Sequence, residues 1–153
     1  MARQAWYAVV VAGVVLIAAL IYTDLPGFPR VRDDATASST VQLKEQSIRV
    51  TVVDTPEARE MGLSGREGLA EDEGMLFVFP KDDRYAFWMK DMRFAIDILW
   101  ISHDGSIVHV EENVSPESYP AVFTPRQAAR YVLELPPGWV QAHEMGVGDI
   151  VRL

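Results

Sequence analysis

Eighteen consecutive residues without a charge run from Ala5 to Tyr22, with the sequence AWYAVVVAGVVLIAALIY. A helix of that length spans roughly 27 Å, close to the hydrocarbon thickness of a bilayer. Trp6 and Tyr7 lie at one end of the run and Tyr22 at the other, where aromatic rings favour the membrane interface. A core helix of a small domain usually keeps a polar face, and this run has none. We therefore expect residues 1–23 to form a transmembrane helix.

The residues that flank this run predict its orientation in the membrane and whether it is cleaved. Arg3 and the amino terminus precede it and Asp24 follows it, which favours an N-terminus inside the cytoplasm and a domain outside. The segment Leu20–Pro26 is a poor match to a signal-peptidase site, which needs small residues just after the apolar run. The sequence thus predicts an uncleaved, single-pass signal anchor in the cytoplasmic (inner) membrane, with the lipid bilayer as the partner of residues 5–22.

Residues 24–40 mix Pro, Gly, Ser, Thr and charged residues without helical or strand periodicity. This composition is typical of an extended linker. We expect the linker to hold a single folded domain, residues 41–153, away from the membrane.

The charge of the chain limits the partners of this domain. Of 14 basic and 22 acidic side chains, only Arg3 precedes residue 23, so residues 23–153 carry a formal charge of −9. Nucleic acids and anionic membrane surfaces bind clustered basic residues, so neither is expected to bind the domain. The chain has no cysteine, which excludes disulfides, thiol catalysis and cysteine-based metal sites.

The domain is predicted to consist mainly of short strands. Residues 47–54 alternate between apolar and polar, as a half-buried strand does. Asp104-Gly105 lies between two β-type runs and is a strong hairpin signal. Further strands are expected over residues 74–79, 85–89, 95–102, 106–112, 129–135 and 148–153, from their apolar and β-branched composition and their flanking turn residues.

Two short helices are expected between these strands. Thr55 is suited to be the N-cap of a helix over 56–61, with Pro56 at its first position and Gly62 at its end. Residues 139–144 have room for one or two helical turns. The complete pattern predicts a mostly β (α+β) domain, with six to seven short strands forming a small β-barrel or sandwich and two short helices.

Five separated motifs occur along the domain, namely AREMGLSGR (58–66), GMLFVF (74–79), FWMKDM (87–92), IDI (96–98) and YVLEL (131–135). In this order they closely resemble the domain-of-unknown-function family numbered 192, over about residues 41–153. Asp91 stands where that family often has Asn. The resemblance implies a small β-rich domain that is frequently exported or membrane-tethered in prokaryotes, and it implies no established activity.

The motif around Trp88 contains the first candidate binding residues. On a strand, Trp88 and Lys90 face one side while Met89 and Asp91 face the other. In one interpretation the indole and the ammonium form a binding wall for a planar or sugar-like ligand. In the other, Trp88 fills the core and Lys90 pairs with a nearby acid.

Asp97 and Glu134 each interrupt an apolar strand. An unpaired buried carboxylate costs several kcal/mol, so if they are buried the expected partners are Arg59 and Lys90. The four residues would form either the acid–base site of a hydrolase or isomerase, or a structural ion-pair network. Arg59 is expected to point away from the face that carries Met61 and to bind Asp97 or Glu134, which would clamp the helix to the sheet.

The function expected from the sequence is that of a membrane-tethered extracytoplasmic binding or accessory domain. Its candidate ligand-binding residues are Arg59, Trp88, Lys90, Asp97 and Glu134, and its partner would be an envelope glycan, a small molecule or a protein. The alternative is the carboxylate-dependent enzyme.

A copper site is a minor alternative, because methionine sulfur and imidazole both bind copper, although methionine is more often core filler. No cofactor or metal is therefore expected. The methionines and histidines concerned are Met61, Met75, Met89, Met92, Met145, His103, His109 and His143.

Overall fold

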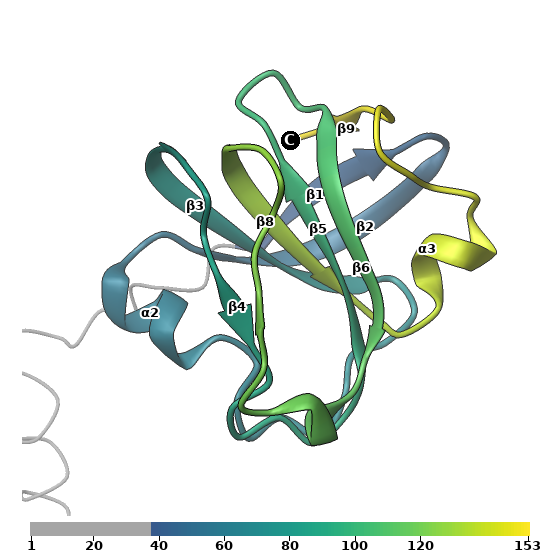
Figure 1. Cartoon of the computed structure of the whole chain (residues 1–153). Helices are drawn as coiled ribbons and strands as arrows, with labels where there is room; N and C mark the ends of the chain where they lie inside the picture. Colours follow the sequence, from purple (N-terminus) through teal and green to yellow (C-terminus); the bar gives the residue numbers. More distant parts are fainter. Residues whose placement is uncertain (1–37) are drawn as a thin grey trace, which may run out of the picture. The chain divides into compact units, whose positions relative to one another are not determined.

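The computed structural model describes residues 38–153, which form a curled seven-stranded sheet with two short α-helices (Figure 1). The sequence-based prediction of a mostly β domain with two short helices is confirmed, and the curled sheet has the form of a half-barrel. The transmembrane helix predicted over residues 1–23 and the linker up to residue 37 lie outside the described residues. Within residues 38–153, no helix is long and apolar enough to cross a membrane.

The strands of the large sheet have the order β6-β5-β8-β3-β2-β1-β9. Their bounds are β1 (Ser38–Leu43), β2 (Gln46–Val53), β3 (Glu73–Asp83), β5 (Ile96–Ile101), β6 (Ile107–Val114), β8 (Ala129–Leu135) and β9 (Val151–Arg152). A small second sheet pairs β4 (Phe87–Trp88) with β7 (Val122–Phe123). The helices are α2 (Pro56–Met61) and α3 (Trp139–Ala142), and a 3₁₀ turn, η1, covers Pro116–Ser118.

Alternation of side chains along the strands gives the large sheet two apolar faces. On one face, Leu135 of β8 belongs to a buried cluster that Trp139 of α3 completes. On the other, Phe77 of β3 and Val132 of β8 pack with Leu63, which follows α2. In Figure 1, α2 and β4 accordingly lie on the left of the sheet and α3 on the right. The central strands are therefore buried on both sides.

The sheet curls until its two edge strands, β6 and β9, approach each other. β9 pairs with β1, and Ser106, just before β6, forms a bridge with Ile150. Gly105 permits this approach, because it has a φ of +88° and a Cβ there would lie 2.6 Å from the carbonyl oxygen of Val151. The predicted Asp-Gly turn between β5 and β6 is confirmed, and it also holds the last strand in place.

Helix α2 forms where the sequence predicts it. The backbone N–H of Ala58 donates to Thr55 Oγ1 at 3.2 Å, and the helix ends at Gly62 with a φ of +50°. α2 connects β2 to β3, which pair in parallel. A parallel pair requires a crossover connection, and this one lies over the face that contains Phe77.

Three features differ from the prediction. β1 was not expected as a strand, and because it begins at Ser38, residues 38–40 of the predicted linker belong to the sheet. β3 was expected to stop at Pro80, but it continues to Asp83, with Pro80 inside a register shift between Val78 and Asp83. A proline there removes no ladder hydrogen bond. The third is β7, which the sequence did not indicate.

Candidate functional site

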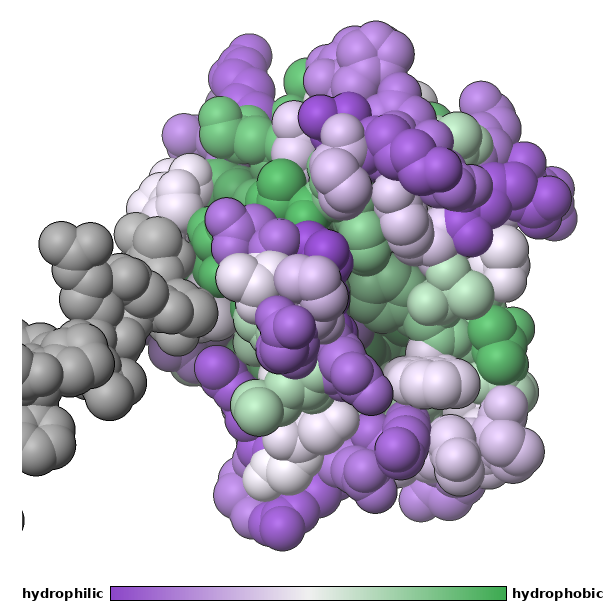
Figure 2. All heavy atoms as spheres, turned by 90° about the vertical axis from the view of Figure 1, so that its left-hand side faces the viewer, coloured by the Kyte–Doolittle hydropathy of each residue, from purple (hydrophilic) through white to green (hydrophobic). Residues whose placement is uncertain are grey.

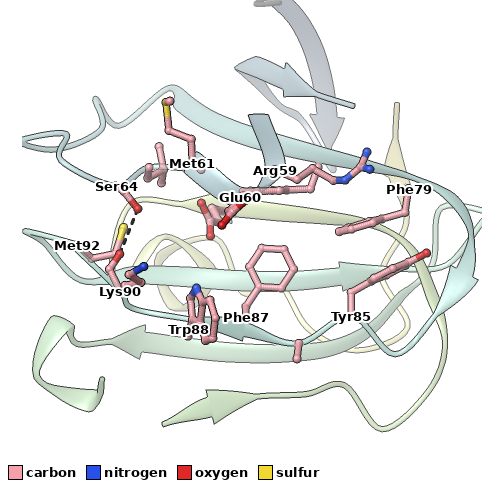
Figure 3. Close-up of a pocket in the computed structure, with 15 residues that line it drawn as sticks. Arg59, Glu60, Met61, Ser64, Phe79, Tyr85, Phe87, Trp88, Lys90 and Met92 are labelled. Atoms are coloured by element: carbon pink, nitrogen blue, oxygen red, sulfur yellow. Dashed lines mark hydrogen bonds between the residues drawn. The ribbon is translucent and has the colours of Figure 1, made fainter. Parts of the chain in front are cut away.

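A cleft with a volume of about 240 Å³ opens on the face of the sheet that α2 covers (Figure 3). α2 and the turn after it form one wall, and residues 85–88 form the opposite wall. Glu134 of β8 and Phe77 of β3 contribute to the floor. Figure 2 shows this side of the domain hollowed, with hydrophobic residues inside the hollow and hydrophilic residues at its borders.

The wall formed by residues 85–88 is aromatic and braced from behind. Tyr85 stacks on Phe79 of β3, with ring centroids 3.5 Å apart. Phe87 meets the buried ring of Trp100 edge-on at 5.8 Å, and Trp100 Nε1 donates to the carbonyl of Tyr85 at 2.8 Å. Trp88 is 55% exposed and extends the wall outward. The cleft therefore presents fixed apolar rings to any ligand, and Trp88 does not fill the core.

Arg59 of α2 lies at one end of the cleft, but it does not make the predicted ion pair. Its Nη1 donates to the carbonyls of Asp54 and Val78, the latter at 2.9 Å, and its guanidinium lies 5.1 Å from the centroid of the Phe79 ring. Among residues 38–153, no carboxylate oxygen lies within 4.0 Å of it. The helix is fastened to β3 through the backbone carbonyl of Val78 instead, at the register shift where β3 leaves β8.

Lys90 lies at the other end of the cleft, near Ser64 and Met92 in Figure 3. Its carbonyl accepts a hydrogen bond from Ser64 Oγ at 3.1 Å, and Gly65 N donates to the carbonyl of Asp91 at 3.0 Å. These bonds join the turn after α2 to the turn after β4. No carboxylate of the described chain lies within 4.0 Å of Lys90 Nζ, so the predicted pairing with an acid is not formed and the ammonium is available to a ligand.

Glu134 provides a carboxyl group at the floor of the cleft. It lies on the central strand β8, opposite Met75 of β3 and Ile98 of β5, and is only 6% exposed. Its Oε2 is buried without a hydrogen-bond partner among residues 38–153. Burial raises the pKa of Glu134 to about 8, because the charged form loses its hydration. At neutral pH the group is therefore mostly protonated and can donate a hydrogen bond to a ligand.

Asp97 lies on the opposite face of the sheet and does not contribute to the cleft. Asp97 of β5 lies opposite Leu135 of β8, and the next residue, Ile98, lies opposite Glu134. Because successive side chains of a strand point to opposite faces, Asp97 and Glu134 lie on different sides of the sheet. Its carboxylate accepts hydrogen bonds from the backbone N–H groups of Val140 at 2.8 Å, Asn113 at 2.8 Å and Gly138 at 3.1 Å. Asp97 therefore holds the start of α3, and neither the predicted acid–base pair with Glu134 nor the predicted ion-pair network is formed.

The histidines and methionines do not assemble into a copper site in the described part of the chain. Residues 38–153 contain no group of three His, Cys, Asp or Glu that could hold a metal ion. Met61 and Met92 line the cleft, but no histidine lines it with them. The histidines bond to separate partners, His103 to Asp82, His109 to Glu111 and His143 to the carbonyl of Trp139.

Four of the five residues expected at a binding site thus line one cleft, namely Arg59, Trp88, Lys90 and Glu134. The aromatic residues Phe79, Tyr85 and Phe87 were not singled out from the sequence. Their available signal was the two-residue spacing of aromatic side chains in 77–79 and 85–87, which places each pair on one face of an extended segment.

Comparison with known proteins gives one family and two solved structures. The family DUF192, described as uncharacterised ACR, matches residues 38–153. A crystal structure from Sinorhizobium meliloti 1021, described as that of a proposed transcription regulator, is 33% identical, with a TM-score of 0.73 over 78% of this chain and 95% of that one. A protein of unknown function from Novosphingobium aromaticivorans DSM 12444 shares the fold at 22% identity, with a TM-score of 0.71 over 86% and 94% of the two chains. No curated protein matches the sequence.

Proposed function

The chain belongs to the DUF192 family, and we propose that its domain is a binding module, held at the membrane by residues 5–22 on the extracytoplasmic side. Its binding site is the cleft between α2 and β4. The domain binds its ligand without transforming it, as an accessory component of the cell envelope.

The observation that carries this proposal is the state of Glu134. A buried carboxyl oxygen without a hydrogen-bond partner destabilises a fold by about 1–3 kcal/mol. The neighbouring position on the same face of β8 is occupied by the apolar Val132, which packs in the buried cluster. An apolar side chain could therefore fill the position of Glu134 as well, and the packing of the sheet does not require a carboxyl group there. Since Glu134 faces an open cleft with aromatic walls, a ligand that bonds to it would offset this penalty.

The Sinorhizobium protein's described role gives no reason to propose DNA binding here. Residues 23–153 carry a formal charge of −9, and a DNA-binding surface needs clustered basic residues. The cations of the cleft are two, Arg59 and Lys90, and they lie at its opposite ends. Such an arrangement suits a small ligand better than a phosphate backbone.

The proposal is tested by ligand-induced thermal stabilisation of residues 34–153. This fragment contains both hydrophobic clusters. The two crystallised relatives consist of little more than the matched domain, because the match covers 95% and 94% of their chains. Envelope sugars, short peptides, small organic acids and metal salts would be screened by differential scanning fluorimetry. A ligand at one hundred times its Kd is expected to stabilise the domain by about 2.7 kcal/mol.

The control for this screen is a variant with a blocked cleft. Ser64→Trp would fill the end of the cleft near Lys90, whereas Ser39→Trp places the same residue at an exposed position of β1. A ligand of the cleft must stabilise the Ser39→Trp variant and fail to stabilise the Ser64→Trp variant. If every hit acts equally on both, or no compound acts on either, the proposed small-ligand site is wrong and a protein partner takes its place.

An enzymatic function is the second candidate, because a carboxyl group with a pKa of about 8 in a cleft is suited to act as a general acid. Since Asp97 lies on the other face, such an enzyme would use Glu134 with Lys90 or Arg59 stabilising a developing anion. The two candidates separate once a ligand is known. A binding module returns the ligand chemically unchanged after prolonged incubation, whereas an enzyme converts it and loses that conversion in Glu134→Gln.

A further inference from the structure

Seven polar side chains line the cleft, and three of them are already hydrogen-bonded to backbone carbonyls. Ser64 Oγ donates to the carbonyl of Lys90, the hydroxyl of Tyr85 donates to a backbone carbonyl 2.8 Å away, and Arg59 Nη1 donates to two carbonyls. In the described chain, the lining side chains without a hydrogen bond are the exposed Glu60, Trp88 and Lys90 and the buried Glu134, which is at the floor. A sugar, with a hydroxyl on most of its carbons, would leave many of those hydroxyls unbonded here.

The charge of the cleft is opposite to that of the domain around it. Arg59 and Lys90 both line it, and its acids are the exposed Glu60 and the buried Glu134. Because Glu134 is mostly protonated at neutral pH, the lining then carries two positive charges and one negative charge. An anion is therefore attracted to a cleft within an otherwise acidic domain.

The walls determine the shape of the ligand. Phe87 and Trp88 on one side and α2 on the other leave a space of about 240 Å³. In Figure 3, one side of this space is lined by the rings of Tyr85, Phe87 and Trp88. Lys90 and Glu134 both line this space, together with the aromatic wall.

Taking the cleft as the binding site proposed above, we propose that its ligand is a small aryl or arylalkyl carboxylate. The ring lies against Phe87 and Trp88, and the carboxylate is held by the Glu134 carboxyl group, which donates a hydrogen bond to it, and by the Lys90 ammonium. A charge-assisted hydrogen bond between a carboxyl group and a carboxylate is stronger than a neutral one. It gives the Glu134 carboxyl group a hydrogen-bond partner that the described chain does not supply.

The test uses residues 34–153 and five probes, with binding followed at the indole N–H signals in ¹H–¹⁵N spectra. Phenylacetate carries the proposed ring and charge, phenylacetamide is its neutral counterpart and phenethylamine is its cationic one. Acetate lacks the ring, and glucuronate replaces the ring with a sugar. Trp88 is the reporter, while Trp139, which is buried on the other face of the sheet, serves as the internal control. Phenylacetate is expected to shift the Trp88 signal with a Kd roughly five- to tenfold below that of phenylacetamide.

Two lysine variants locate the charge that is recognised. Lys90→Met removes the ammonium at the cleft, and Lys81→Met removes an exposed ammonium that pairs with Asp83 outside it. Lys90→Met should weaken phenylacetate binding and leave phenylacetamide binding unchanged, whereas Lys81→Met should alter neither.

The dependence of binding on pH tests whether the Glu134 carboxyl group donates the hydrogen bond to the ligand. Above about pH 8 the wild-type domain should lose affinity for phenylacetate, because an ionised Glu134 repels the carboxylate. Glu134→Gln retains an N–H donor and cannot ionise, so its Kd should stay constant between pH 6 and pH 9. The other ionisable groups that line the cleft are Arg59, Glu60, Tyr85 and Lys90, and this variant leaves them all in place.

Several results would overturn the carboxylate proposal while leaving a binding cleft intact. They are a preference for phenylacetamide, phenethylamine or glucuronate at the Trp88 signal, or the same loss of affinity with pH in Glu134→Gln. If none of the five probes moves the Trp88 signal at millimolar concentration, the carboxylate proposal is wrong. A hit in the thermal screen that depends on the cleft would then still support the binding function.

Discussion

Glu134 and Asp97 are the two buried carboxyl groups of the described chain, and their surroundings differ in one decisive respect. Asp97 is surrounded by backbone N–H groups, three of which donate to it. Glu134 has an oxygen with no donor at all among residues 38–153. A carboxylate with three donors is a structural element, whereas a carboxyl group without any favours its protonated form. Residue type alone does not distinguish these two roles.

The protonation of Glu134 makes the stability of the domain depend on pH. Its pKa is raised from 4.5 to about 8 on folding, so between these values the folded state binds a proton that the unfolded state does not. This contribution to stability is complete below pH 4.5 and is lost as pH rises to about 8. Relative to the wild type, Glu134→Gln should gain stability with rising pH, by roughly 1 kcal/mol per pH unit between pH 5 and pH 8.

Urea unfolding of both proteins at pH 5, 6, 7 and 8 measures this difference. Glu60→Gln changes an exposed acid at the same cleft and serves as the control, with no such slope expected. A constant difference between Glu134→Gln and the wild type across this range would contradict a raised pKa for Glu134.

Replacing Asp97 by Asn should destabilise the domain even though the two side chains have the same size. The amide NH₂ cannot accept a hydrogen bond, so at least one of the backbone N–H groups of Val140, Asn113 and Gly138 would lose its partner. The expected loss is about 1–3 kcal/mol in the free energy of unfolding.

Asp91→Asn is the matched control for that substitution. Asp91 has a φ of +58°, in the left-handed region that Asn tolerates as well as Asp or better, and its side chain is exposed. Its free energy of unfolding should change by less than about 0.5 kcal/mol. The same φ explains why Asn is the residue that the sequence resemblance leads one to expect at this position.

At the scale of elements, predictions succeeded where local chemistry decides the structure. Helix α2 follows from Thr55, Pro56 and Gly62, and its observed bounds are those predicted. β8 is also found over its predicted residues, 129–135, because its sequence, ARYVLEL, is mainly apolar and is followed by two prolines. β3 was ended too early, since the consequence of Pro80 depends on whether the neighbouring strand still pairs there. That information lies in the tertiary structure and not in the local sequence.

The candidate site was predictable in part for the same reason. Residue types identified Arg59, Trp88, Lys90 and Glu134, which the fold brings to one cleft. Asp97 was wrongly grouped with them, because the register that places Ile98 beside Glu134 decides which side of the sheet Asp97 faces. A shift of one residue in that register would reverse the assignment.

The hairpin between β5 and β6 gives an element-scale prediction about the closure of the sheet. Gly105→Ala places a methyl group 2.6 Å from the carbonyl oxygen of Val151 and requires a φ of +88° from alanine. The loss in the free energy of unfolding should be roughly 2–4 kcal/mol. Gly146→Ala is the control, because nothing lies within 4 Å of a Cβ there, and its effect should stay below about 1 kcal/mol. Equal effects of the two substitutions in urea titrations would show that Gly105 is not needed for closure.

At the scale of the whole molecule, the membrane anchor proposed for residues 5–22 predicts how the chain behaves in membrane fractions. A full-length chain should remain in the membrane pellet after an alkaline carbonate wash, whereas residues 24–153 should be released. In intact spheroplasts, externally added protease should digest the domain of the full-length chain. Release of the full-length chain by carbonate would contradict the anchor, and protection from protease would contradict the extracytoplasmic orientation.

The pairing of β1 with β9 joins the first and the last strand of the domain. A chain that is synthesised from its N-terminus can form the β1–β2 hairpin early, but the other edge of β1 must wait for residues 151–152. Until they arrive, β1 presents unpaired backbone groups on which a neighbouring nascent chain can add a strand. A strand of only two residues therefore covers Gln42 and Leu43 of β1, and during biosynthesis this part of the edge stays open until residues 151–152 are made.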